Sequence, residues 1–203
     1  MVIGVTAAHV VRQFAHDIKN EQFQLNLMNE IVNDLLDRVI CISDKLDLAT
    51  IALDDELVER LGKVPLSMWP PLPPEEGRGI MIAGFPGVER LQPEPRKISW
   101  GLFTVLGVAR TVSHQQITWL IEPEHNIPSP KIPTPPPQYP LGGISGGPLV
   151  SWFESDAHLV HYRLSGIVVE HPDYAGNTDL PPIERLVAVR ADTITETGRI
   201  IEI

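Results

Sequence analysis

The chain has 203 residues, 43% of them hydrophobic, which is enough to bury a core in one medium domain or in two small ones. It carries 26 acidic and 16 basic residues, giving a formal net charge of −10, and no Lys/Arg cluster that could follow a phosphate backbone. This composition excludes nucleic acid as an expected partner, and no segment approaches the roughly 18 apolar residues of a membrane span.

Short apolar segments separated by Gly, Pro and Asp dominate the chain and predict strands. In chain order these are residues 2–5, 23–27, 39–42, 48–53, 80–83, 103–112, 117–121, 164–169 and 186–189. Helical periodicity is found at residues 28–36 and again at 192–197. The predicted class is all-β, as barrels or a sandwich, with a short C-terminal helix.

Two proline-rich segments interrupt this pattern. Residues 65–74 hold five prolines, which cannot continue a central strand because proline fixes φ and lacks an N–H. We therefore expect a first domain at 1–66, a linker at 67–78 and a second domain at 79–203. Residues 123–140 hold eight prolines and predict a stiff loop beside a site, with a polyproline II ligand as the alternative.

The single cysteine, Cys41, excludes an intrachain disulfide and is typical of a reducing compartment. Met1 is followed by neither a basic nor an apolar region of a signal peptide, so the expected location is the cytoplasm. Cys41 and three histidines that match no motif or metal spacing are interpreted as structural: His16, His114 and His125.

Residues 143–148 read Gly-Ile-Ser-Gly-Gly-Pro and are the most informative motif. An attacking serine hydroxyl has to be exposed on a tight turn, which glycines permit, beside backbone N–H groups that point at the developing oxyanion. We predict Ser145 as the nucleophile and the N–H groups of Gly143 and Ser145 as the oxyanion hole. The alternative is a glycine-rich turn with an incidental serine.

The same motif satisfies Gly-x-Ser-x-Gly, the nucleophile elbow of α/β-hydrolases. An elbow needs a strand before the serine and a helix after it. Ser145 instead follows a proline tract, and residues 146–148, Gly-Gly-Pro, prevent a helix from starting there. Histidines do follow at His158, His161 and His171, but without alternating strands and helices around them, so the sequence disfavours this fold.

A serine hydroxyl is a weak nucleophile at neutral pH and needs a base that a carboxylate orients. His9 lies in an apolar segment, residues 5–11, which predicts a strand that holds the imidazole at a barrel rim. Asp47 stands at the head of the strand predicted at 48–53. Taken singly, each residue has an ordinary explanation, a surface or core histidine and a turn aspartate.

Together, however, three segments resemble the signatures of the trypsin/chymotrypsin family, in the family's order: Thr-Ala-Ala-His at 6–9, Asp-Leu-Ala-Thr-Ile at 47–51, and the motif at 143–148. Residues 82–87 and 164–168 also resemble second-barrel segments of disulfide-free, Deg-type bacterial members. The resemblance covers most of the chain. It implies two six-stranded β-barrels, the first carrying the histidine and aspartate and the second carrying the serine.

The resemblance further implies a serine endopeptidase that acts on polypeptides without a cofactor or a metal. Ser145 Oγ would attack the peptide carbonyl, His9 would accept its proton and Asp47 would hold the imidazole tautomer. The residues that correspond to the primary specificity pocket and to the strand that pairs with substrate are Tyr139, Leu164, Ser165, Gly166 and Ile167. Tyr139 offers no carboxylate, which favours small or medium apolar substrate side chains over Arg or Lys.

Two features depart from the family pattern. Members activated by cleavage have an aspartate before the nucleophile, which pairs with a freed N-terminal amine; this chain has Ile144, so other contacts are expected to hold the turn. Only eight residues precede His9, so the first barrel is expected to be incomplete, with either further strands upstream or residues 12–37 covering its open edge. The alternative function is a catalytically impaired pseudoprotease that binds peptides. The oligomeric state is not predicted.

Overall fold

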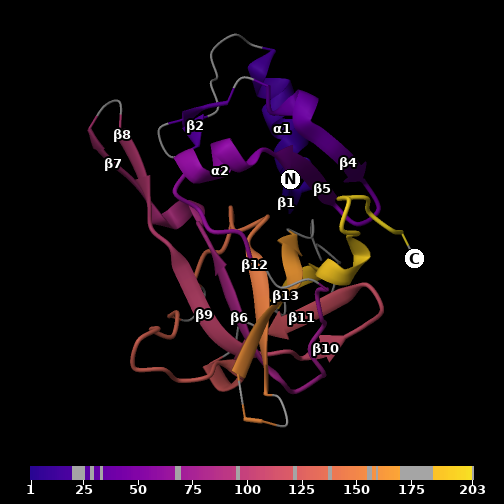
Figure 1. Ribbon diagram of the computed structural model, residues 1–203. Helices are drawn as coiled ribbons and strands as arrows, with labels where there is room; N and C mark the ends of the chain where they lie inside the picture. Colours follow the sequence, from indigo (N-terminus) through magenta and orange to yellow (C-terminus); the bar gives the residue numbers. More distant parts are fainter. Residues whose placement is uncertain are drawn as a thin grey trace, which may run out of the picture. The chain divides into compact units, whose positions relative to one another are not determined.

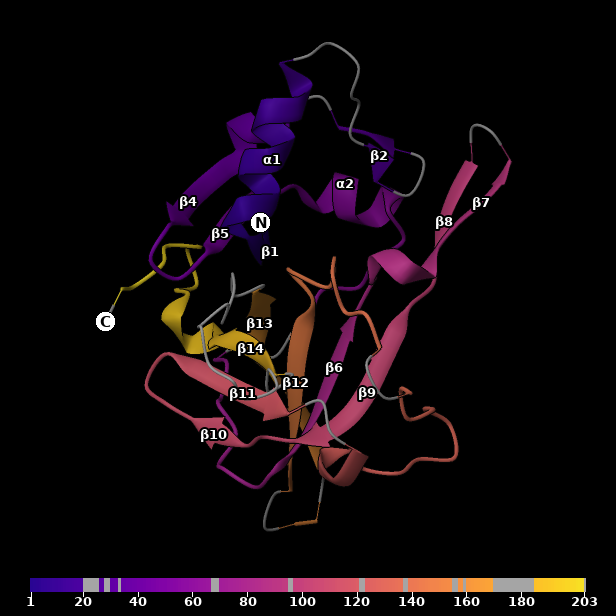
Figure 2. The same cartoon turned by 180° about the vertical axis from the view of Figure 1, so that it is seen from behind.

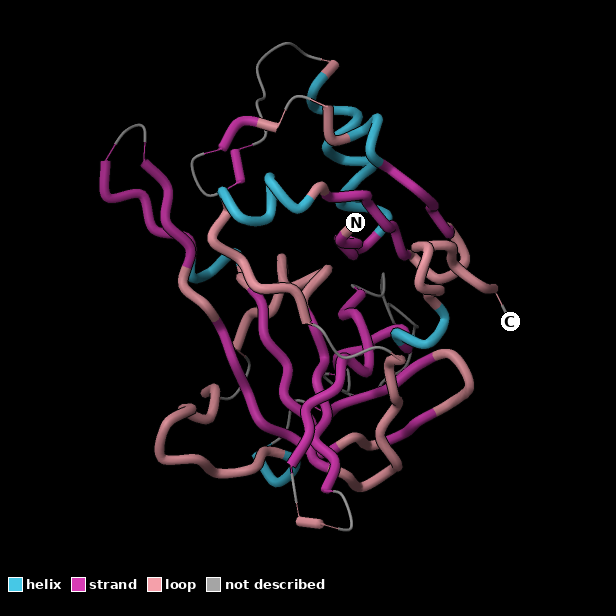
Figure 3. Tube along the Cα trace, viewed as in Figure 1, coloured by secondary structure: helices cyan, strands magenta, loops and turns pink. Residues whose placement is uncertain are grey.

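The structure is a computed structural model that describes residues 1–19, 26–27, 30–32, 34–66, 70–94, 97–120, 123–136, 139–154, 157–158, 160–169 and 185–202. The chain is mostly β, as predicted, and has few helices (Figure 3). It divides into two compact units: unit 1 contains Met1–Trp69 and Thr193–Ile203, and unit 2 contains Pro70–Asp192. The domain limits predicted from the prolines stay a prediction.

Unit 1 is built on an antiparallel sheet in the order β1-β5-β4, formed by Val2–Ala7, Leu48–Leu53 and Val39–Ser43. Helix α1 (Ala8–Ile18) lies over this sheet (Figure 2), and α2 (Asp55–Arg60) follows β5. The central strand is buried on both faces because each face has a cover. Ala49 and Ile51 pack with α1 and α2, whereas Thr50 on the other face donates a 2.5 Å hydrogen bond to the carbonyl of Gly198.

The helix predicted at 28–36 is wrong at its described positions. Glu30–Ile31 forms β3, which pairs with β2 at Asn26–Leu27, and Leu36–Arg38 forms the 3-10 turn η1. Val32 and Leu35 are nevertheless buried in the cluster that contains α1. The apolar spacing therefore identified buried positions, but tertiary packing overrode the helical preference.

Arg38 connects η1 to α2 through two carboxylates. It donates hydrogen bonds to Asp34 (2.9 Å) and Asp54 (2.6 Å), and Asp54 also caps α2 by accepting a 2.6 Å bond from the N–H of Leu57. Hydrogen bonding to Arg38 lowers the pKa of both Asp34 and Asp54 below the ordinary value of 3.8.

A carboxylate with a lowered folded-state pKa contributes stability that is present above its unfolded pKa and is lost as pH falls through its folded pKa. We therefore expect acidification from about pH 6 to about pH 3 to lower the urea midpoint less in Arg38→Gln than in the wild-type protein. Arg78→Gln, which removes an exposed pair with Glu75, is the matched control and should behave as wild type. Circular dichroism measures each midpoint, and equal acid sensitivity of Arg38→Gln and wild type would contradict the prediction.

Unit 2 contains a curled seven-stranded antiparallel sheet (Figure 1) in the order β10-β11-β14-β13-β12-β6-β9. In that order the strands are Thr111–Val112, Gln116–Leu120, Arg185–Arg190, Val160–Val169, Pro148–Glu154, Gly79–Gly84 and Phe103–Val108. Alternate residues point to the concave core, as the period of two for strands requires. This core includes Ile80, Ile82, Phe103, Val105, Ile117, Trp119, Leu149, Val168, Leu186 and Ala188.

Most predicted strands are confirmed, and five of them within one or two residues: 2–5, 39–42, 48–53, 80–83 and 186–189. The strand predicted at 164–169 is confirmed at its end but begins four residues earlier, at Val160. The segment 103–112 is two strands instead of one, because the chain turns at Ala109 and Arg110. The N–H of Ala109 donates to the carbonyl of Arg78, and the N–H of Arg110 donates to the carbonyl of Thr118. The segment 117–121 begins inside β11, although Ile121 lies outside the described residues, as do residues 23–25 of the segment 23–27. Strand β12 was not predicted.

The predicted C-terminal helix at 192–197 is wrong beyond its first turn. Ala191–Thr193 forms the 3-10 turn η4, after which Ile194 pairs with Ile200 as an isolated bridge. The hydroxyl of Thr195 accepts a 3.0 Å hydrogen bond from the N–H of Arg199. Such side-chain bonding to the backbone competes with helix formation, so the segment closes as a turn.

A two-stranded hairpin projects from unit 2 between β6 and β9 (Figure 1). Its strands are β7 (Arg90–Glu94) and β8 (Lys97–Trp100), and the 3-10 turn η2 (Gly87–Glu89) leads into it. A further 3-10 turn, η3 (Pro123–His125), opens the second proline-rich segment. Among the described residues, no helix has the length and apolar character needed to cross a membrane.

Candidate active site

His9 lies in the first turn of α1, not in a strand as predicted, because β1 ends at Ala7 and the helix begins at Ala8. Its ring Nδ1 is 2.7 Å from Asp47 Oδ2. The other carboxylate oxygen of Asp47, Oδ1, accepts a 2.9 Å hydrogen bond from the backbone N–H of His9. The two residues that the sequence placed 38 positions apart are therefore in direct contact through both oxygens.

Asp47 is held at this position by its own backbone. It adopts φ = 51°, a left-handed conformation that few residues other than Gly, Asn and Asp adopt readily. Its carbonyl oxygen accepts a 2.9 Å hydrogen bond from the N–H of Ala8. Asp47 thus accepts from the first two N–H groups of α1, which have no partner inside the helix, and its negative charge is favourable beside the helix N-terminus.

The contact with Asp47 favours one tautomer of the His9 ring, with the proton on Nδ1. When Nδ1 donates its proton to the carboxylate, the second ring nitrogen, Nε2, carries a lone pair and can accept a proton from another group. The His9 side chain is partly exposed, so Nε2 is not enclosed by the core of unit 1. This arrangement is suited to general-base catalysis.

Ser145 occupies a tight turn in unit 2. Gly143 and Gly146 on either side adopt φ = 94° and 85°, conformations that side-chain-bearing residues rarely adopt. The turn is closed by hydrogen bonds from the N–H of Ile144 to Leu141 (3.1 Å) and from the N–H of Gly147 to Ile144 (2.9 Å). The N–H of Gly146 donates to Val168 of β13 (2.8 Å), which ties the turn to the sheet.

The predicted oxyanion donors are the N–H groups that this network leaves unpaired. Within the described residues of unit 2, the N–H groups of Gly143 and Ser145 donate to no carbonyl. Among these residues Ser145 Oγ has no hydrogen-bond partner, but it is buried and not exposed as the sequence predicted. In contrast, the N–H groups of Ile144, Gly146 and Gly147 are all used in the fold. Unpaired N–H groups in the turn that carries a serine hydroxyl are the kind of donor that a developing oxyanion requires.

The end of β6 and the start of η2 support this turn. Gly87 donates a 2.7 Å hydrogen bond to the carbonyl of Gly142, just before the motif. Gly147 packs so closely on β6 that a Cβ there would overlap the carbonyl oxygen of Ala83. The segment 82–87, which the sequence linked to the motif only by resemblance, therefore contacts the turn directly. The sequence did not identify Gly87 or Ala83 as supporting residues.

Tyr139 lies six residues before Ser145 and is fixed by two neighbours. Its hydroxyl donates to a carboxylate oxygen of Glu89, and its ring stacks on Phe103 with centroids 5.1 Å apart. Burial and the bond to Glu89 raise the pKa of Tyr139 to about 12. The sequence analysis did not identify Glu89. Its carboxylate is bonded to Tyr139, the position at which the sequence showed no acidic side chain.

The prediction for β13 needs a correction for the backbone of Gly166 and Ile167. Gly166 pairs with Leu149 of β12 and Arg190 of β14, and Ile167 pairs with Pro148 and Val189 in the same way. A strand that is paired on both edges has no free edge to which a substrate strand can be added. The assignment of Ile167 to substrate binding stays a prediction for its side chain. Gly166 has no side chain, so its assignment stays a prediction only as a position that leaves space for substrate.

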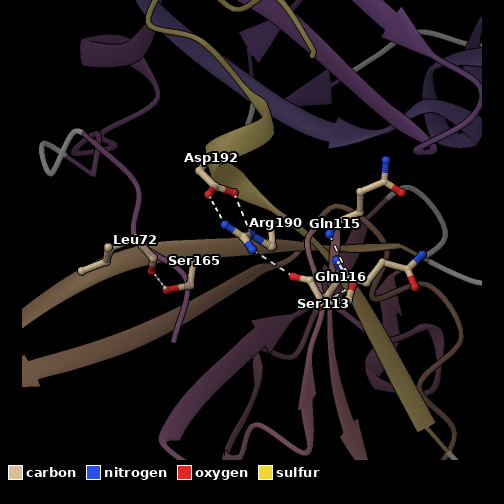
Figure 4. Close-up of polar contacts among 7 residues, drawn as sticks. All are labelled: Leu72, Ser113, Gln115, Gln116, Ser165, Arg190 and Asp192. Atoms are coloured by element: carbon tan, nitrogen blue, oxygen red, sulfur yellow. Dashed lines mark hydrogen bonds and ion pairs between the residues drawn. The ribbon is translucent and has the colours of Figure 1, made fainter. Parts of the chain in front are cut away.

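Leu164 and Ser165 precede these residues in β13. Leu164 pairs with Val150 of β12, and Ser165 is buried with its hydroxyl donating a 2.6 Å hydrogen bond to the carbonyl of Leu72 (Figure 4). Ser165 therefore secures the proline-rich segment after residue 69 to the sheet. Its substrate-binding role also stays a prediction.

Figure 4 further shows how β14 is held at its end. Arg190 forms an ion pair with Asp192 and donates a 2.9 Å hydrogen bond to the carbonyl of Ser113, in the turn between β10 and β11. The ion pair with Asp192 raises the pKa of Arg190, which remains charged. These contacts lie beside the backbone pair Gly166–Arg190 and stabilise this end of the sheet.

The remaining sequence candidates are in ordinary settings. Cys41 lies in β4 as a free thiol, and His16 lies near the end of α1 with Nδ1 3.3 Å from Asp17 Oδ1. His114 lies in the turn between β10 and β11, and His125 lies in η3. His171 lies outside the described residues. In the described part of the chain, no group of three or more His, Cys, Asp or Glu side chains is arranged to hold a metal ion.

The three predicted catalytic residues are thus divided between the units. His9 and Asp47 come together in unit 1, and Ser145 lies with its unpaired N–H groups in unit 2. The contact between Ser145 and His9 stays a prediction. No protein-family model matches the chain, and a search of curated protein sequences also finds no match.

Proposed function

We propose that the protein is a serine endopeptidase of the two-barrel trypsin/chymotrypsin type, similar to its disulfide-free bacterial members. The observation that carries the proposal is the hydrogen bond between His9 Nδ1 and Asp47 Oδ2, which leaves Nε2 as a base. The turn at Ser145, with two unpaired N–H groups, gives independent support. In this proposal unit 2 corresponds to the second barrel and unit 1 to an incomplete first barrel.

The proposed reaction requires Ser145 Oγ to come within hydrogen-bonding distance of His9 Nε2. The serine oxygen attacks the carbonyl carbon of a peptide bond while its proton passes to Nε2, and Asp47 stabilises the resulting imidazolium. The N–H groups of Gly143 and Ser145 bind the oxyanion. His9 then gives the proton to the departing amine, and a water molecule, activated in the same way, hydrolyses the acyl-enzyme and restores Ser145.

A fluorophosphonate probe tests the proposal without knowledge of the substrate. Its phosphorus forms a bond to Ser145 Oγ, fluoride leaves, and His9 takes the serine proton. We expect the wild-type protein to be labelled at Ser145, as located by peptide mass spectrometry. Ser145→Ala should not be labelled, and labelling of His9→Ala should fall by at least about a thousandfold.

His16→Ala is the matched control because it removes a histidine from the other end of the same helix. It should be labelled at the wild-type rate. A folded wild-type protein that is labelled no faster than Ser145→Ala would overturn the proposal. The second candidate, a peptide-binding pseudoprotease, would then be favoured, since the described residues of unit 1 form a main sheet of three strands and no closed barrel.

A further inference from the structure

Ile144, the residue before the proposed nucleophile, is part of the core of unit 2 although it belongs to no strand. Its exposed fraction is 5%, and it clusters with apolar side chains of β6, β9, β12 and β13. Its side chain lies directly on Gly84 at the end of β6, where a Cβ would overlap Ile144 Cγ1. The isoleucine side chain therefore packs in space that the absence of a side chain at Gly84 leaves open.

The backbone of the same residue forms the turn. The N–H of Ile144 donates to Leu141, and its carbonyl oxygen accepts from the N–H of Gly147, so its two hydrogen bonds close the turn on both sides of Ser145. The N–H of Ser145 belongs to the peptide unit that follows Ile144, so any conformation that reorients this N–H has to rotate a peptide unit next to Ile144. Such a rotation would draw the isoleucine side chain out of the core and expose it to water, which is unfavourable. The N–H of Gly143 belongs to the unit between Gly142 and Gly143, whose carbonyl accepts the 2.7 Å hydrogen bond from Gly87.

We propose that Ile144 is a positioning residue whose burial forms the Ser145 turn as part of the folding of unit 2. The oxyanion donors are then in place in the folded protein and need neither an activating cleavage nor a bound partner. This inference rests on the proposed function of Ser145. It assigns to an apolar contact the task that a charged contact performs in family members activated by cleavage.

The test compares two isoleucines of the same core cluster. Ile144→Ala removes the proposed anchor, and Ile80→Ala removes the same atoms from the start of β6, where Ile80 pairs with Gly107 and Ser151 and has no role in the turn. Both variants are labelled with the fluorophosphonate well below the lower of their melting temperatures. We expect the labelling rate to fall by at least about tenfold in Ile144→Ala and to stay near the wild-type rate in Ile80→Ala.

Ile144→Val keeps a branched apolar side chain and should restore labelling to within about twofold of wild type. Equal labelling of Ile144→Ala and Ile80→Ala would overturn the inference while the proposed protease function stands. A wild-type protein that is not labelled would instead overturn the proposed function. The positioning role of Ile144 would then have to be tested by a measurement that does not depend on the reactivity of Ser145.

Amide hydrogen exchange supplies that measurement, in a Ser145→Ala background. The N–H groups of Gly146 and Gly147 are protected by their bonds to Val168 and Ile144. We expect both to exchange at least about tenfold faster when Ile144→Ala is added, and no such change with Ile80→Ala. If Gly146 and Gly147 exchange alike in the two variants, the turn does not depend on Ile144 and the inference is wrong.

Discussion

Replacing Asp47 with asparagine is expected to slow fluorophosphonate labelling of Ser145 by about 10³ to 10⁴-fold while unit 1 remains folded. The reason is that the backbone N–H and the ring Nδ1 of His9 contact different oxygens of Asp47. The backbone N–H of His9 can only donate, so the asparagine oxygen stays on it and the new NH₂ group faces Nδ1. The ring must then accept at Nδ1 and carry its proton on Nε2, which can no longer take the serine proton.

Asparagine suits this position because it adopts the left-handed conformation of Asp47 as readily as aspartate does. The thermal unfolding of unit 1 should therefore change little compared with the change in labelling rate. Asp17→Asn is the matched control, since Asp17 also lies beside a histidine, His16, but at the far end of α1. If Asp47→Asn is labelled within about tenfold of wild type, Asp47 acts only as a helix cap.

The contact of His9 with Asp47 could be predicted from the sequence, but its geometry could not. The order and spacing of the motifs paired the two residues, whereas the apolar segment 5–11 indicated a continuous strand. The chain instead changes from β1 to α1 at Ala7, and Ala8 and Val11 then pack on β5 with helical spacing. Both the end of the strand and the start of the helix are apolar, so the segment is too short and too uniform for its periodicity to show where one ends and the other begins.

The Ser145 turn shows the opposite balance. Its glycines predicted the tight turn, because positive φ values are restricted to few residues, and the role of Gly143 and Ser145 as oxyanion donors stays a prediction. The supports of the turn were not predicted, since Ala83, Gly84 and Gly87 lie about sixty residues away in sequence and meet the motif only through tertiary packing. The sequence showed that Ile144 could not form the ion pair found in cleavage-activated members of the family that the motifs resemble, but not that its side chain enters the core.

The surroundings of the residues proposed to bind substrate were the least predictable part of the candidate site. The apolar run at 164–169 was correctly predicted as a strand, but a strand pattern does not reveal how many neighbours the strand has. Strand β13 lies between β12 and β14, so the backbone of Gly166 and Ile167 is already paired. The carboxylate of Glu89 next to Tyr139 depends on a contact between residues 50 positions apart, and no local motif signals it.

Replacing Gly147 with alanine is expected to destabilise unit 2 by about 1 to 3 kcal/mol or more, and to abolish most labelling of Ser145. The added Cβ would overlap the carbonyl oxygen of Ala83 and lie 2.9 Å from the carbonyl oxygen of Ile144. Both obstacles are backbone atoms, so no side-chain rotation relieves the overlap. Either the end of β6 or the turn itself has to move, and urea unfolding together with the labelling rate measures both effects.

Gly142→Ala separates this steric cause from the general effect of losing a glycine. A Cβ at Gly142 would meet no heavy atom within 4 Å, so we expect a stability change within about 0.5 kcal/mol of wild type, or a slight gain from reduced freedom of the unfolded chain. Equal losses in the two variants would contradict a close approach at Gly147 alone. A loss confined to Gly147→Ala would mean that this glycine is required for the space between the turn and β6.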